Sequence, residues 1–321
     1  MAQATNLSTG PGSARRIIKG LAQLAVTGLV TWLILERLGP GLSEVARTAP
    51  RQLDPRWGWI AASCGVLAAG YVFSGWIWGR MVEDLGGPAM PARDAIRTYM
   101  VANLGRYVPG KVWQIAGLAL LARARGVPAP IATAAAVVGQ AVALAGAMLV
   151  GLPALGGADP NLSRWAAGAA TIGVLTVVIV PKIFRPLLRL WLSWTPGETP
   201  AEVPIGALKG FRWLTLYTLN WGGYALAFWM LIRGLSLPGG LLEVGPAFAA
   251  AYVSGYIVLF APAGLGVREA TMVAFLTPLM GPSGAALAAV AARVWMTVVE
   301  VVPAGALWLS GFGRTRRGRA L

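Results

Sequence analysis

The sequence predicts an all-α, polytopic transmembrane bundle, and three observations support this prediction. Hydrophobic residues make up 56% of the 321-residue chain, charged residues make up only 12%, and mean hydropathy is +0.64. Apolar runs recur that are long enough to cross a hydrocarbon core of about 30 Å at about 1.5 Å per residue. These runs are apolar nearly all round, whereas a soluble helical core needs amphipathic stripes. We therefore expect about six crossings and, in addition, two re-entrant helical hairpins.

The chain reads as one transmembrane domain over residues 15–312 between two tails. Residues 1–14 form a polar tail predicted to be disordered, and residues 313–321 form a basic tail. The first apolar run follows basic residues without a close cleavage site, so we expect a retained signal-anchor helix. A basic loop is expected over 182–212. The six predicted crossings lie at about 17–36, 57–79, 130–151, 165–181, 213–232 and 285–311.

Two further apolar segments, 94–124 and 244–281, are interrupted near their middles by proline and glycine. Proline removes a helical hydrogen bond, and irregular backbone at membrane depth is tolerated only inside protein or beside a water-filled cavity. We interpret each segment as a re-entrant hairpin. The alternatives are one kinked crossing or two tilted ones. The residues expected to act as tips or hinges are Pro109, Gly110, Pro262, Gly264 and Gly266.

The distribution of Lys and Arg predicts the orientation of the chain. With six crossings and both termini in the cytoplasm, 17 of the 27 Lys and Arg residues are cytoplasmic, 6 are outside and 4 are embedded. This bias agrees with the positive-inside rule. We therefore expect a multi-pass protein of the cell (plasma or inner) membrane.

The two hairpin segments resemble each other, which predicts an internal repeat. Tyr99 and Tyr252 are 153 residues apart, as are Pro109 and Pro262. The preceding crossings run in opposite directions, so the repeats, about 57–181 and 213–311, would be inverted in the membrane. Inverted repeats with broken helices are a common transporter architecture, with the binding site between the repeats.

Composition excludes several classes of function. The chain has no histidine and one cysteine, which removes disulfides, Cys/His zinc sites and histidine-based catalysis. We therefore expect no metal and no cofactor. We also expect no enzymatic activity, with a membrane enzyme on lipid substrates as the alternative, in which only Glu269 and Glu300 could serve as nucleophile or base. The net charge of +15 is explained by membrane orientation and anionic lipid rather than by nucleic acid.

Charged residues inside apolar sequence are the main functional signal. Each costs about 2.5–3.5 kcal/mol at the centre of a membrane helix, so such residues must pair, meet water or face a polar ligand. Four embedded cations outnumber two embedded carboxylates, which predicts an anionic ligand carrying phosphate. The alternatives are that the charges only lock the hairpins together, or that Lys111 snorkels to the surface. The candidate binding residues are Arg106, Lys111, Gln114, Arg268, Glu269, Arg293 and Glu300.

Arg293 and Glu300 are seven residues apart on one predicted helix, and therefore lie two turns apart on one face. They are too distant to bond each other well. We expect them to reach the two hairpins instead, either as part of a ligand site or as a helix–helix contact.

At these residues the chain resembles the lysylphosphatidylglycerol synthase transmembrane family, a flippase-like membrane domain. The resemblance rests on the segments Asn103-Leu-Gly-Arg-Tyr-Val-Pro-Gly-Lys-Val-Trp-Gln114 and Ala261-Pro-Ala-Gly-Leu-Gly-Val-Arg-Glu269, and on the hydrophobic layout across 15–312. It implies re-entrant helices around a lipid-sized cavity and a role in lipid translocation or lipid-linked envelope chemistry. Full-length synthases carry a soluble transferase domain after the membrane part. Because this chain ends at Leu321, we expect a stand-alone member without lysyl transfer.

The resulting expectation is a translocase for an anionic phospholipid or a polyprenyl-phosphate-type lipid. Arg106, Arg268 and Arg293 would hold the head group, and Glu269 and Glu300 would balance charge. One alternative is a non-transporting partner of a glycosyltransferase or envelope complex, and another is a secondary transporter of a small anion. A homo-oligomer is compatible with the translocase hypothesis and with both alternatives.

Overall fold

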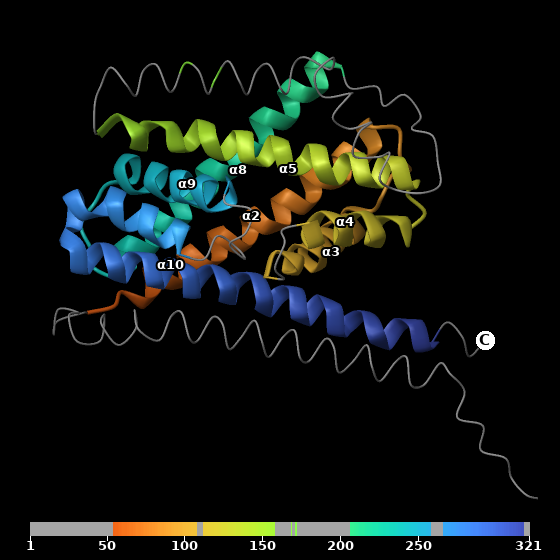
Figure 1. Cartoon of the computed structure of the whole chain (residues 1–321). Coiled ribbons are helices and arrows are strands. Elements are labelled where there is room, and N and C mark those ends of the chain that lie inside the picture. The colour runs from red at the N-terminus through yellow and green to blue at the C-terminus, as the bar shows by residue number, and fades with distance from the viewer. Residues whose placement is uncertain are drawn as a thin grey trace, which may run out of the picture.

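The computed structural model describes residues 54–107, 112–157, 206–257 and 266–317, together with the isolated positions 168 and 171. Within these residues the fold is entirely helical (Figure 1). The predicted crossings at 17–36 and 165–181, apart from the isolated positions in the latter, lie outside the described residues. So does the predicted tail at 1–14.

Two long antiparallel helices, α2 (Trp57–Asp84) and α8 (Ala207–Gly234), form the centre of the fold. Arg56 N–H donates to the carbonyl of Gly234 at one end of the pair. At the other end Trp213 donates to Asp84 at 2.8 Å, and Arg212 forms an ion pair with the same carboxylate. Helix α8 begins at Ala207, so the prediction of a loop reaching residue 212 was wrong. The ion pair with Asp84 holds Arg212 in the first turns of this helix.

The first broken segment forms two short helices that pack against each other. They are α3 (Ala92–Asn103), extended by the 3₁₀ turn η1 (Leu104–Tyr107), and α4 (Val112–Arg123). Each α-helix has 12 residues and is therefore about 18 Å long, too short to cross a hydrocarbon core of about 30 Å. The interruption predicted around Pro109 and Gly110 thus falls between the two helices.

The second broken segment is also divided into two helical parts. Helix α9 (Leu241–Ile257) is followed, after residues 258–265, by α10 (Val267–Arg317), whose backbone is interrupted at Gly281 with φ 72° and ψ 169°. The part of α10 before Gly281 packs back on α9, and the part after it is the predicted last crossing. Gly281 adopts the left-handed region, which a residue without Cβ enters at little cost. The helix continues to Arg317, so the first part of the predicted basic tail is helical.

Helices α5 (Ala129–Gly151), with the 3₁₀ turn η2 (Leu152–Gly157) after it, and α10 lie on opposite sides of the central pair (Figure 1). Helix α5 packs on α8 and α9, and α10 packs on α2 and α3. Gly146 permits the α5–α8 contact, because a Cβ there would lie 2.9 Å from backbone atoms of Tyr217 and Thr218. Small residues on α5 therefore allow close helix packing, as expected in membranes.

Within the described residues, three helices are long and apolar enough to cross a membrane: Trp57–Asp84, Ala129–Ala154 and Val267–Leu307. Helix α8, the predicted fifth crossing, is not among them, although it is as long as α2. Large apolar side chains such as Leu120, Leu219 and Val302 are exposed on the outer faces of the bundle. Such surfaces suit a lipid environment rather than water.

Candidate functional site

Glu300 on α10 is the centre of a buried polar network with the first hairpin. Its side chain is only 2% exposed. One carboxylate oxygen accepts a hydrogen bond from the amide of Asn103 and lies 3.3 Å from Nε of Arg106. The other oxygen accepts the hydroxyl proton of Tyr107 at 2.7 Å. A carboxylate in hydrocarbon must be paired in this way, because an unpaired buried charge is costly.

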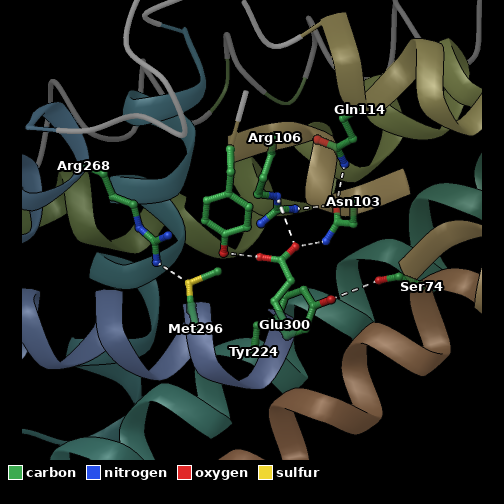
Figure 2. Close-up of polar contacts among 9 residues, drawn as sticks. Ser74, Asn103, Arg106, Gln114, Tyr224, Arg268, Met296 and Glu300 are labelled. Atoms are coloured by element: carbon green, nitrogen blue, oxygen red, sulfur yellow. Dashed lines mark hydrogen bonds and ion pairs between the residues drawn. The ribbon is translucent and has the colours of Figure 1, made fainter. Parts of the chain in front are cut away.

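Asn103 extends this network to both arms of the hairpin (Figure 2). Its side-chain carbonyl accepts hydrogen bonds from Arg106 at 2.8 Å and from Gln114 of α4 at 2.6 Å. A single amide at the end of α3 therefore connects Glu300, Arg106 and Gln114. This arrangement holds the Arg106 guanidinium between the hairpin and α10.

A second ion pair ties α10 to its own N-terminal part, which belongs to the second hairpin. Nη1 of Arg293 lies 3.5 Å from Oε1 of Glu269. The other oxygen of Glu269 accepts the backbone N–H of Gly266 at 2.7 Å. Gly266 has φ +83° and stands immediately before the first turn of α10, so Glu269 caps that helix. Arg293 and Glu300 thus reach different hairpins, as their spacing predicted.

Arg268 differs from the other two arginines in its surroundings. It is 6% exposed, and its guanidinium donates to the sulfur of Met296 at 2.7 Å. The guanidinium carbon also lies 5.0 Å from the ring centre of Phe248 and 5.7 Å from that of Tyr252. Within the described residues, no carboxylate forms an ion pair with it. Sulfur is a weak acceptor, so this guanidinium is held mainly by cation–π contacts.

These groups surround one cavity, which encloses about 550 Å³ of space, part of it open to the outside. Three arginines face it or border it, against the carboxylates of Glu300 and Glu269 in the described part of the chain. The local charge is therefore positive. The lining residues come from both hairpins and the long part of α10: Arg106, Tyr107, Gln114, Tyr252, Gly255, Tyr256, Arg268, Arg293, Met296, Thr297 and Glu300.

The structure therefore brings together six of the seven candidate binding residues. Arg106, Gln114, Arg268, Arg293 and Glu300 line the cavity, and Glu269 joins it through Arg293. Lys111 lies outside the described residues, as do four of the five predicted tip residues, Pro109, Gly110, Pro262 and Gly264. The fifth, Gly266, is the N-terminal neighbour of α10.

Sequence reasoning missed Asn103, which bonds to Glu300 without lining the cavity, and several residues that do line it. Asn103 and Tyr107 lie in the quoted motif, and their polar side chains beside Arg106 were an available signal. Tyr252 and Tyr256 are four residues apart on α9 and so share a face, which is a weaker signal because apolar aromatic stripes do the same. Thr297 and Met296 gave no signal beyond lying between Arg293 and Glu300. Among the residues that the structure describes, no group of His, Cys, Asp and Glu could hold a metal ion.

An all-helical fold with apolar outer faces and a buried cationic cavity between broken helices defines a multi-pass integral membrane protein. Residues 20–304 match the family described as Lysylphosphatidylglycerol synthase TM region, and the chain belongs to that family. This membership indicates a membrane domain of lipid-related function. A comparison with curated proteins gave no match for this sequence.

Proposed function

We propose that this protein is a non-enzymatic translocase for an anionic, phosphate-bearing lipid, either a phospholipid or a polyprenyl-phosphate-type lipid. The observation that carries the proposal is Arg268, a buried guanidinium beside a cavity with no carboxylate partner among the described residues. A phosphate group entering the cavity would replace a thioether contact by charge-assisted hydrogen bonds. Such bonds contribute about 1.5–3 kcal/mol each.

The division of charge between the two hairpins supports the same proposal. Arg106 already has Glu300 and Asn103 as partners. Among the described residues, Arg268 contacts a sulfur atom and two aromatic rings and forms no ion pair with a carboxylate. A phosphate oxygen would therefore meet Arg268 first, with Arg293 as a second donor partly neutralised by Glu269. The planar guanidinium suits a bidentate contact with phosphate.

The arrangement of helices supports re-entrant hairpins within an inverted repeat. Helices α2 and α8 have 28 residues each, run antiparallel and start 150 positions apart. Each is followed by a residue of positive φ at the same offset, Gly86 and Ser236, and then by a broken helical segment. The cross-contacts also correspond, since α5 packs on α9 while α10 packs on α3. In this proposal the two hairpins enter a plasma or inner membrane from opposite faces, both termini are cytoplasmic, and the proline and glycine tips act as gates.

The proposal is tested by reconstituting the purified protein in vesicles with a head-group-accessible fluorescent lipid. We expect phosphatidylglycerol to exchange between leaflets faster than zwitterionic phosphatidylcholine. The positively charged cavity would repel the choline cation of phosphatidylcholine. Arg268→Gln should slow phosphatidylglycerol exchange by about 10-fold to 100-fold, equivalent to one or two charge-assisted hydrogen bonds. Arg80→Gln is the matched control, because Arg80 is exposed, lines neither described cavity, and contacts the neighbouring Glu83 and Trp76 of its own helix.

Three results would contradict the proposal. If neither phosphatidylglycerol nor a polyprenyl-phosphate lipid changes leaflet, the protein is not a translocase, and stable co-purification with an envelope enzyme would favour a scaffold role. If inorganic phosphate is transported without lipid exchange, the protein is a small-anion transporter. If Arg268→Gln and Arg80→Gln behave alike, Arg268 does not hold the lipid.

A further inference from the structure

A second cavity adjoins the cationic one. It has about 440 Å³ of space, part of it open to the outside, and its lining residues belong to α2, α3, α4, α5, α8, α9 and α10, as well as η1. Arg106, Gln114, Tyr252 and Met296 line both cavities, so the two are neighbours that share a wall.

The chemistry of the second cavity differs from that of the first. Of the described residues that line it, Arg106 alone is charged, and that arginine stands at the shared wall, held by Glu300. Other polar groups of the lining are hydroxyls and amides, contributed by Tyr71, Ser74, Tyr99, Gln114, Gln140, Tyr217, Asn220, Tyr224 and Tyr252. A second phosphate would find no further cation here, whereas a neutral group with several hydroxyls would find donors and acceptors on several sides.

Aromatic side chains complete this lining. The ring of Trp221 lies 4.6 Å from the ring of Tyr252 and 5.2 Å from that of Tyr224, at steep angles to both. Ser74 shares a hydrogen bond of 3.0 Å with the hydroxyl of Tyr224 and accepts one from Asn220 at 2.8 Å (Figure 2 shows the first). These contacts between α2 and α8 hold the rings and hydroxyls in place.

One hydroxyl of the lining has no partner in the described part of the chain. Tyr71 is 4% exposed, its oxygen is buried, and no hydrogen bond satisfies that oxygen. A buried hydroxyl without a partner is unfavourable, and most buried polar atoms in proteins are satisfied. An apolar lipid tail in the cavity would leave this hydroxyl unpaired, whereas a hydroxyl-bearing ligand would satisfy it.

We propose that the second cavity binds the uncharged polyol, glycerol or sugar, that is carried on the lipid phosphate. This inference rests on the proposed function, because the phosphate beside Arg268 positions the rest of the head group. The polyol hydroxyls bond to Tyr71 and the neighbouring amides, and its C–H faces pack on the aromatic rings. The protein therefore selects phosphodiester lipids with a neutral, hydroxyl-rich head group.

The test compares lipids of equal charge that differ only in the polyol. In reconstituted vesicles, wild-type protein should move phosphatidylglycerol at least about threefold faster than phosphatidylmethanol, since each neutral hydrogen bond contributes about 0.5–1.5 kcal/mol. A second pair, a short polyprenyl-phosphate hexose and the corresponding polyprenyl methyl phosphate, distinguishes sugar from glycerol as the preferred polyol. The pair with the larger rate ratio identifies the source.

Tyr71→Phe removes only the unpartnered hydroxyl, so the variant should fold as well as wild type. It should reduce the preference for the polyol lipid by about threefold to tenfold, with little change in the rate for the methyl lipid. Ser63→Ala is the matched control, because Ser63 is on the same helix, is buried, has an oxygen without a partner, and lines neither cavity. Gln140→Met, on helix α5 rather than α2, should reduce the preference independently.

The outcomes separate the two proposals. Equal transport of polyol and methyl lipids by wild-type protein, or an unchanged preference in both Tyr71→Phe and Gln140→Met, would overturn the polyol site while leaving the translocase intact. Absence of exchange for every anionic lipid would overturn the proposed function and, with it, this inference.

Discussion

The two hairpins hold their arginines in opposite ways. In the first, Arg106 is enclosed by Glu300, Asn103 and indirectly Gln114, so each charge has a counter-charge or a hydrogen-bond partner. In the second, Arg268 lies against Met296, Phe248 and Tyr252, none of which carries a formal charge. The comparison shows that Arg106 is paired within the protein, whereas in the described part of the chain no carboxylate forms an ion pair with Arg268.

The largest effect on stability is expected at Glu300. Glu300→Gln leaves the buried Arg106 without its carboxylate, and breaking a buried pair from one side costs about 3–5 kcal/mol. The free energy of unfolding, measured by detergent titration in mixed micelles, should fall by about this amount. Removing both charges in Arg106→Gln with Glu300→Gln should restore part of the loss.

Glu83→Gln is the control for this measurement, because Glu83 forms an exposed pair with Arg80 that contributes about 0–1 kcal/mol. A loss at Glu300 no larger than that at Glu83 would show that the first hairpin is not held by its charge network.

An intermediate effect is expected at Glu269, whose side chain is 24% exposed. Glu269→Ala removes both the helix cap at Gly266 and the ion pair with Arg293, and should lower the free energy of unfolding by about 1–2 kcal/mol. Glu269→Gln keeps a capping oxygen and should lose less, since glutamine also serves in this position. Equal losses in both variants would show that the ion pair, not the cap, is the main contribution.

The smallest effect on stability, despite a large effect on transport, is expected at Arg268. Arg268→Met removes a buried charge that has no carboxylate partner in the described part of the chain, so the free energy of unfolding should change by about 1 kcal/mol or less, or should rise. Thermal unfolding in detergent and lipid exchange in vesicles are measured on the same preparation. A destabilisation as large as that of Glu300→Gln would remove the distinction between the two hairpins.

Much of the fold was predictable because membrane helices are specified locally. The long apolar runs predicted α2, α5 and the last crossing to within a few residues, and proline and glycine predicted where the two broken segments are interrupted. The boundary that was wrong, at the start of α8, depended on a distant residue: Asp84 pairs with Arg212, which the sequence analysis assigned to a loop.

The sequence by itself determined that this chain is a membrane protein and that embedded cations exceed embedded carboxylates, because hydropathy and charge are properties of composition and local order. It also placed Arg293 and Glu300 on one helix face, because helical periodicity fixes that relation. Only the tertiary structure decided which side chains Arg293 and Glu300 contact. Glu300 finds Asn103 and Tyr107, residues 197 and 193 positions away, through the packing of α10 on the first hairpin. The ionic partner of Arg106, and the absence of such a partner for Arg268 among the described residues, follow from that packing, which no local pattern encodes.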